Sequence, residues 1–252
     1  MVFELPQYDY IYLGDNARAP YGNRSFDAVH QYTLESVQAL FNMGCQLIIL
    51  ACNTASAKAL RSIQQNYLPT TDAYKRVLGV IRPTTESVRS YTKTGHIGIL
   101  GTSGTVNSQS YPIEIEKFSP GVKVYQQACP MWVPLVENNE FNSPGADYFV
   151  KKYLDQLFEQ SPKIDALVLG CTHYPLLIDK IKTFLKPDIQ VLSQSEIVAH
   201  GLKDYLARHP EMEVLCEKGG KLTCYTSDDP TVFDTMAGIF FEKPLRSRHL
   251  VI

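Results

Sequence analysis

Hydrophobic residues along this chain fall into short continuous apolar runs and into longer stretches with apolar positions every three or four residues. The first pattern is typical of parallel strands buried on both faces, and the second of helices that cover a sheet. The apolar runs predict strands at residues 10–13, 46–50, 77–80, 96–100, 122–126, 164–169, 189–192 and 221–226. The periodic stretches predict helices at residues 25–43, 56–66, 84–91, 107–118, 145–159, 174–185, 195–208 and 231–241.

This alternation of strand and helix predicts an α/β fold of two similar lobes, each a mainly parallel sheet flanked by helices. A chain of 252 residues is long enough for two lobes of ordinary domain size. We place the first lobe at residues 1–93 and the second at 94–205, and we expect residues 206–252 to pack back on the first. Because ligands of open parallel sheets bind at the carboxyl ends of the strands, we expect the active site in the cleft between the lobes.

The charge balance indicates a small soluble substrate. The chain has 24 Lys and Arg against 26 Asp and Glu, so it lacks the broad basic surface that binds nucleic acids or anionic membranes. No apolar stretch approaches the ~20 residues of a membrane-spanning helix, and the N-terminal sequence does not resemble a signal peptide. We therefore expect a cytoplasmic protein without a nucleic-acid or membrane partner.

The cysteines are not spaced like a disulfide framework or a metal site. They stand at positions 45, 52, 129, 171, 216 and 224, without a C-x-x-C pair or the dense spacing of small secreted domains. Cys171 and His173 could form one ligand pair for zinc, but no second pair lies near them in the sequence. We expect reduced thiols and no metal ion.

Two of the predicted strands run directly into a cysteine that is followed by polar residues. Cys52 follows the strand at 46–50 and precedes Asn-Thr, and Cys171 follows the strand at 164–169 and precedes Thr-His. A buried cysteine that only fills space does not require polar residues after it, and here the arrangement occurs twice. We predict that the two thiols face each other across a shared pocket, with His173 tuning protonation beside the second.

Two glycine-containing loops are candidate anion sites. The loop at residues 14–22 carries Tyr21, and the loop at residues 101–105 carries Thr102; successive backbone N–H groups in such loops can bind an anion. The second loop lacks the lysine of a phosphate-binding P-loop, and no G-x-G-x-x-G follows the first strand. Nothing therefore indicates a nucleotide cofactor.

Seven segments carry a family resemblance: GDNARAPYG at 14–22, ACNTAS at 51–56, GVIRPT at 79–84, GTSGTV at 101–106, CPMWVPLVE at 129–137, LGCTHYPLL at 169–177 and YTSDDPTVF at 225–233. Together they resemble the glutamate racemase family of the aspartate/glutamate racemase superfamily. The resemblance implies a two-lobed α/β fold, a homodimer, and interconversion of L- and D-glutamate without a cofactor. It also implies that the D-isomer supplies bacterial peptidoglycan, and thus cell-wall biogenesis and cell shape.

The resemblance also implies a role for each matching residue. Cys52 and Cys171 would be the two acid/base thiols, with His173 as a third catalytic residue. The residues implied to bind substrate are Tyr21, Gly22, Asn53, Thr54, Thr102, Thr172 and His173, and those in supporting positions are Asp15 and Glu137. Chemistry agrees with this assignment, because inverting Cα without a cofactor requires one group that removes a proton and another that delivers one from the opposite face.

The sequence departs from the family pattern at two places. Members usually begin with a strand and a D-S-G-x-G-G turn whose Asp and Ser hold the amino group and assist one thiol, whereas this sequence starts MVFELPQYDYIYLGD. We therefore expect weak or absent racemase activity, and reduced stability or altered association. The second departure is Ser-Gln-Ser at 193–195, where an acidic segment is more usual, and we attach no consequence to it here.

Three other functions stay open. Another enzyme of the superfamily would act on aspartate, a hydantoin or maleate, although Thr-His after Cys171 favours glutamate. A Cys/His hydrolase would use Cys171 with His173 and would leave Cys52 without a role. A non-catalytic binding remnant would keep the pocket and bind D-glutamate without exchanging its hydrogen.

Overall fold

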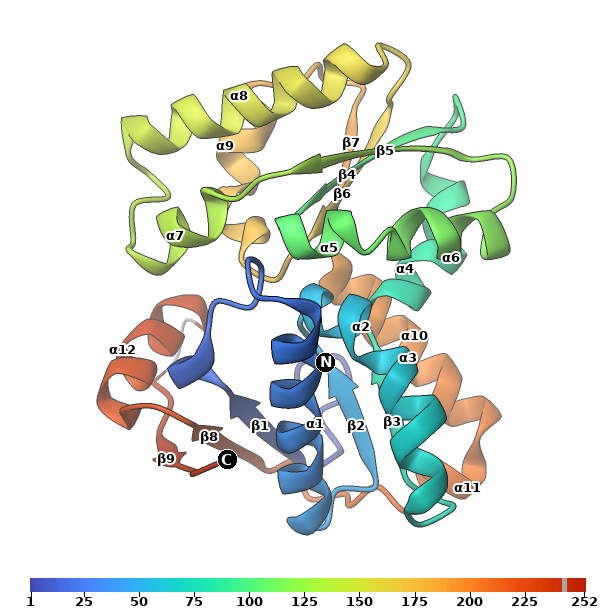
Figure 1. Ribbon diagram of the computed structural model, residues 1–252, viewed down its shortest axis with the longest axis vertical. Coiled ribbons are helices and arrows are strands. Elements are labelled where there is room, and N and C mark those ends of the chain that lie inside the picture. Colours follow the sequence, from blue (N-terminus) through green and yellow to red (C-terminus); the bar gives the residue numbers. More distant parts are fainter. Residues whose placement is uncertain (242–243) are drawn as a thin grey trace.

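Two α/β lobes make up the structure, a computed structural model that describes residues 1–241 and 244–252. Figure 1 shows one lobe above the other, with β2 of the lower lobe directed toward the upper lobe. Every strand pair within the two lobes is parallel, and helices flank the sheets. The predicted fold class is confirmed.

The upper lobe in Figure 1 contains one sheet in the order β5-β4-β6-β7. Its strands are β4 (His96–Gly101), β5 (Lys123–Ala128), β6 (Ala166–Gly170) and β7 (Gln190–Leu192). Its helices are α5 (Ser103–Asn107), α6 (Ser110–Phe118), α7 (Trp132–Glu137), α8 (Pro144–Gln160) and α9 (Ile178–Thr183). All of β6 is buried, as its continuous apolar run predicts for a central strand.

Alternate residues of β6 pack against helices on opposite faces of this sheet. Leu167 and Leu169 lie in a cluster with side chains of α7, α8 and α9. Ala166 and Val168 lie in a second cluster with side chains of α6 and of α4 (Ile81–Ser87). The strand that carries Cys171 is therefore held from both sides.

The lower lobe contains two separate sheets, β1-β8-β9 and β2-β3. Their strands are β1 (Tyr10–Gly14), β2 (Leu47–Leu50), β3 (Arg76–Gly79), β8 (Leu222–Thr226) and β9 (Ser247–His249). Among the described residues β1 pairs only with β8 and β2 only with β3. This lobe thus differs in detail from one continuous sheet, because no hydrogen-bonded ladder joins β1 to β2.

The remaining helices are α1 (Phe26–Asn42), α2 (Asn53–Lys58), α3 (Leu60–Ser62), α10 (Gln194–Arg208), α11 (Pro210–Glu213) and α12 (Pro230–Phe241). Short 3-10 turns lie at Asn16–Arg18, Leu68–Thr70, Val88–Tyr91 and Tyr174–Leu177, and a π-helical turn at Ile63–Tyr67. The predicted limits of the first helix are confirmed. Ser25 caps it by accepting from the N–H of Ala28, and Gly44 ends it at φ +95°.

Three predicted helix boundaries are wrong. The helix after Cys52 begins at Asn53 rather than at residue 56, so the polar residues that follow the thiol form its first turn. The helix predicted from residue 84 begins at Ile81, because proline is tolerated in a first turn. The helix predicted over 107–118 begins at Ser110, because Gln109 adopts φ +56°, and α5 occupies most of the loop predicted at 101–105.

The packing of α10 bears on the predicted domain limits. Leu202 and Leu206 of this helix lie in one cluster with Leu47, Ile49 and Leu78 of β2 and β3, although the predicted boundary at 205 places most of α10 in the second lobe. The division into residues 1–93, 94–205 and 206–252 stays a prediction. Among the described residues, no helix has the length and apolar character needed to cross a membrane.

Candidate active site

Cys52 and Cys171 lie just after the carboxyl ends of strands from different lobes. Leu50 ends β2 two residues before Cys52, and Gly170 ends β6 immediately before Cys171. The Cys52 thiol is among the groups that raise the pKa of Cys171, so the two sulfurs lie within electrostatic range of each other. Each thiol thus lies at a strand end, and Cys52 influences the charge state of Cys171.

Burial is the main influence on both thiols. It raises the pKa of Cys52, against opposing hydrogen bonds from the backbone N–H groups of Ala55 and Thr54 and from the Thr54 side chain. It raises the pKa of Cys171 to about 12, although backbone N–H groups of His173 and Tyr174 oppose it. Both thiols of the free protein are therefore protonated at neutral pH.

The surroundings of the two thiols are unequal. Nδ1 of His173 lies 3.8 Å from the Cys171 sulfur, and its Nε2 lies 3.4 Å from Oε1 of Glu137 at the end of α7. Glu137 also raises the pKa of Cys171. Within the described residues, no carboxylate or imidazole is among the groups that act on the pKa of Cys52. Only the Cys171 side has an adjacent acid/base pair.

Three buried threonine hydroxyls connect the lobes beside Cys52. Thr54 of α2 lies 2.9 Å from Thr102 and 3.3 Å from Thr105, and the latter two are 3.1 Å apart. Thr102 also caps α5 by accepting from the N–H of Thr105. The predicted residues Thr54 and Thr102 are thus brought together, and Thr105 is a member that sequence reasoning missed. Thr172 is exposed and lies 3.5 Å from Nδ1 of His173.

Asp15 holds the loop at residues 14–22 in place. Its carboxylate accepts from the Tyr21 hydroxyl, from Nε of Arg18 at 2.7 Å and from the Ser227 hydroxyl at 2.7 Å. Asp15 follows β1 and Ser227 follows the neighbouring β8. Burial, and then the hydrogen bond to Asp15, raise the pKa of Tyr21. Asp15 and Tyr21 were predicted as site residues from the sequence, whereas Ser227 was not.

The same loop reaches the upper lobe at Gly22. Its carbonyl accepts from the N–H of Gly104 at 2.8 Å, and a Cβ on Gly22 would lie 2.9 Å from Cβ of Thr102. Glycine is required here because any side chain would collide with the threonine. Gly22 is therefore a point of close contact between the lobes, beside the threonine cluster.

The described side chains offer acid/base groups rather than metal ligands. Among them no group of three or more His, Cys, Asp or Glu residues is arranged to hold a metal ion, and all six cysteines are free. Two neutral thiols at strand ends, each with hydrogen-bond donors beside it, are groups that can exchange protons with a small acid. A two-lobed α/β fold with two strand-end thiols is the architecture that the sequence led us to expect of a racemase-type isomerase.

Comparison with known proteins agrees with that class. A sequence profile of the Asp/Glu/Hydantoin racemase family matches residues 3–200. The chain belongs to this family. Glutamate racemases are among its relatives at up to 42% identity, which confirms the resemblance based on the seven segments.

Three relatives illustrate the relationship. The glutamate racemase of Dinoroseobacter shibae is 36% identical over 254 residues, which cover 97% of this chain and 90% of the relative. The structure of glutamate racemase RacE1 from Bacillus anthracis matches at a TM-score of 0.89 and 30% identity, covering 100% of this chain and 91% of that one. The structure of glutamate racemase from Francisella tularensis in complex with D-glutamate matches at a TM-score of 0.85 and 27% identity. The match covers 100% of this chain and 90% of that one.

Proposed function

We propose that this chain interconverts L- and D-glutamate without a cofactor, with Cys52 and Cys171 as its two acid/base groups. The observation that carries the proposal is a pair of strand-end thiols from different lobes, one of which raises the pKa of the other, in a chain of the racemase family. The relatives' names and the D-glutamate bound to the Francisella enzyme support glutamate as the substrate. The D-isomer would supply bacterial peptidoglycan.

In the proposed reaction one cysteine acts as thiolate and the other as thiol. The thiolate removes the proton from Cα, which leaves a carbanion, and the thiol on the opposite face delivers its own proton to that carbon. The configuration is inverted, and the two sulfurs have exchanged protonation states. Proton exchange with water then restores the starting state.

The remaining predicted residues would bind the substrate and stabilise the carbanion. We assign donors to the substrate carboxylate at Asn53, Thr54, Thr102 and Thr172, and we place Tyr21 and Gly22 at the rim. Donors that are already oriented before charge develops are the most effective in stabilising it. His173 and Glu137 would assist proton transfer at Cys171.

A panel of amino acids tests this proposal and separates its rivals. Circular dichroism should show slow loss of optical activity with glutamate, in line with the weak activity expected from the sequence, together with incorporation of solvent deuterium at Cα. Activity only with aspartate or a hydantoin would assign another substrate, and trapping of an acyl-enzyme at Cys171 would assign a hydrolase. Binding of D-glutamate without any exchange would identify a binding remnant.

The raised thiol pKa values predict the pH dependence of the reaction. Because kcat/KM reports the protonation states of the free enzyme and both thiols are protonated at neutral pH, the required thiolate becomes more abundant as pH rises. We expect kcat/KM to increase from about pH 6 to about pH 8.5, approaching tenfold per unit. A flat profile over this range would contradict the assignment of a high-pKa thiol as base.

Glu137→Gln should slow proton transfer on one side of the substrate only. The contact between the Glu137 carboxylate and Nε2 of His173 is changed, so we expect kcat/KM to fall about tenfold, or about 1.4 kcal/mol. The fall should be equal in both directions because both enantiomers have the same free energy. The primary deuterium isotope effect should rise for only one enantiomer of [2-²H]glutamate. The exposed Glu140 provides the control, Glu140→Gln. Equal isotope effects for the two enantiomers would contradict the assignment of Glu137 to proton transfer at Cys171.

The resemblance also predicts a homodimer, and the sequence pattern predicts a cytoplasmic location. Sedimentation equilibrium across a range of concentrations tests the first, and fractionation of cells that express the protein tests the second. A monomer at all concentrations would contradict the predicted dimer.

A further inference from the structure

Three buried side chains form a closed ring of hydrogen bonds next to Cys52. Nδ2 of Asn53 donates to Oε1 of Gln194 at 2.7 Å. Nε2 of Gln194 donates to the Tyr111 hydroxyl at 2.9 Å, and that hydroxyl donates to Oδ1 of Asn53 at 2.8 Å. Exposure is 3% for Asn53, 9% for Gln194 and 0% for Tyr111. Each member of the ring donates once and accepts once.

Further contacts fix the direction of this ring. Nε2 of Gln194 lies 3.1 Å from the Val80 carbonyl and 2.7 Å from the Thr84 hydroxyl. A carbonyl oxygen only accepts, so the amide nitrogen of Gln194 must face Val80 and its oxygen must face Asn53. Since Tyr111 accepts from this nitrogen, its single hydrogen is available for Asn53.

The ring of hydrogen bonds lies next to both segments that carry a thiol, one with Cys52 and one with Cys171. Asn53 immediately follows Cys52 and is the first residue of α2. The Tyr111 ring lies so close to Gly170, which precedes Cys171, that a Cβ there would be 3.3 Å from Cε2 of the tyrosine. The thiolate of Cys171 is also among the groups that raise the pKa of Tyr111.

Gln194 joins these two segments from a third element. It is the first residue of α10, a helix that packs on the strands of the lower lobe, while Tyr111 belongs to α6 of the upper lobe. We propose that Gln194 is a positioning residue. Through its hydrogen bonds to Asn53 and Tyr111 it fixes the first turn of α2, which follows Cys52, relative to the end of β6, which precedes Cys171. This inference deepens the proposed function and rests on it for its activity measurements only.

The chemistry of the position favours glutamine over its near neighbours in size. A buried amide pairs with a donor and an acceptor at once, whereas an ionised glutamate only accepts and a leucine does neither. Removing one partner leaves buried polar groups unsatisfied. The first-turn N–H groups of Thr54 and Ala55 act on Cys52, so displacement of that turn changes the environment of the thiol.

The first experiment follows the reactivity of Cys52 and requires no turnover. Iodoacetamide labelling, read by peptide mass spectrometry across a pH series, gives the titration midpoint of each thiol. We expect Gln194→Leu to move the midpoint of Cys52 upward by about one pH unit, a tenfold change in thiolate at a given pH, while Cys45 stays unchanged. Tyr111→Phe, which removes one hydroxyl only, should move it in the same direction if the leucine variant does not fold.

Asp165→Asn is the matched structural control. Asp165 accepts from the backbone N–H groups of Lys93 and Thr94, at 2.8 and 2.9 Å. It lies before β6, at the end of the strand remote from Cys171. We expect this variant to lose stability without moving the Cys52 midpoint. A Cys52 midpoint that is unchanged in folded Gln194→Leu and Tyr111→Phe would overturn the inference.

A second experiment uses Gln194→Glu and the pH profile of kcat/KM. The protonated carboxyl group has one donor and one acceptor and can close the ring, but the ionised group cannot. The ratio of kcat/KM of the variant to kcat/KM of the unchanged chain should therefore fall at least tenfold as pH rises. A ratio that stays constant would contradict the positioning role of Gln194. Absence of Cα exchange in the unchanged chain would defeat the proposed function instead, and the labelling result would still decide the role of Gln194.

Discussion

Cys52→Ser and Cys171→Ser should each lower the rate of glutamate racemisation by roughly 10² to 10⁴-fold, the usual contribution of one general acid or base. A serine hydroxyl is a much weaker acid than a thiol and forms too little alkoxide to act as a base. It fills nearly the same volume, so the strand ends and the packing around Cys171 should persist. Circular dichroism measures the racemisation rate, and thermal unfolding checks the fold.

The pattern of hydrogen exchange distinguishes this result from general damage to the site. Each variant keeps one thiol, so in deuterium oxide each should exchange the Cα hydrogen of one enantiomer only, and the two variants should differ in which one. Cys45→Ser, at a half-buried thiol that packs in the lower lobe, is the control and should retain activity. Exchange of the same enantiomer by both active-site variants would contradict the two-sided arrangement.

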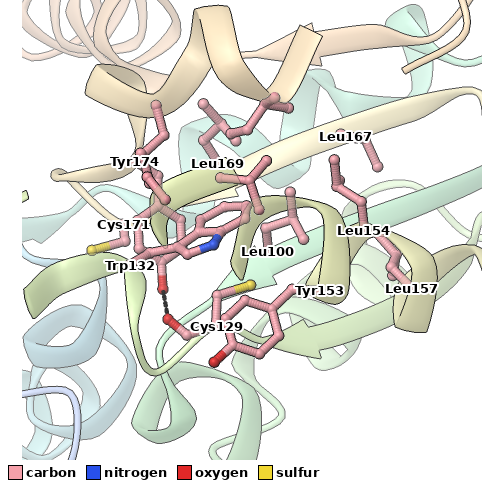
Figure 2. Close-up of a cluster of buried hydrophobic side chains, with 14 of the residues drawn as sticks. Leu100, Cys129, Trp132, Tyr153, Leu154, Leu157, Leu167, Leu169, Cys171 and Tyr174 are labelled. Carbon is pink, nitrogen blue, oxygen red and sulfur yellow. Dashed lines mark hydrogen bonds between the residues drawn. The ribbon is translucent and has the colours of Figure 1, made fainter. Parts of the chain in front are cut away.

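Trp132→Ala should lower the free energy of unfolding by about 3–5 kcal/mol, the range for removing a buried aromatic side chain. Trp132 is 0% exposed and meets the Tyr174 ring edge-on at 4.8 Å. Its indole N–H also donates to the carbonyl of Phe149 at 3.3 Å. Figure 2 shows this packing beside Cys171, whose sulfur points away from the leucine side chains of the cluster.

The same substitution should disturb the site, because Tyr174 follows the Cys171 segment and its hydroxyl donates to the carbonyl of Cys129 at 3.1 Å. Urea unfolding measures the loss of stability, and calorimetry with D-glutamate measures the loss of binding. Tyr148→Ala is the control, since that aromatic side chain of the same lobe is 62% exposed, and its effect should stay within about 1 kcal/mol. An equally small effect at Trp132 would contradict the role of this cluster.

Features that depend on local patterns could be predicted from the sequence. The run Ala-Leu-Val-Leu-Gly predicts a central strand, and β6 is buried at every position. The polar residues after Cys52 and Cys171 indicate that each cysteine follows a strand end, and β2 and β6 end just before them. These inferences hold because side-chain periodicity and strand termination are set by residues close together in the chain.

Features that depend on distant partners could not be predicted. Gln194 is hydrogen-bonded to Asn53, 141 positions away in the sequence, and Ser227 to Asp15, 212 positions away. No sequence pattern around Gln194 or Ser227 indicates these partners. The strand β9 is a polar Ser-Arg-His segment that pairs only because β8 lies beside it. The absence of a ladder between β1 and β2, in the part of the chain described, is likewise a result of tertiary pairing.

The origin of the hydrogen in the first product molecules tests most directly whether two groups act from opposite faces. The unchanged protein is mixed with protiated L-glutamate in deuterium oxide, and both enantiomers are analysed at low conversion. Because a deuterated thiol delivers the new hydrogen, the account predicts D-glutamate fully deuterated at Cα beside L-glutamate that still carries protium. D-glutamate that retains the protium of its precursor would show a single group carrying the proton across, and would contradict the account.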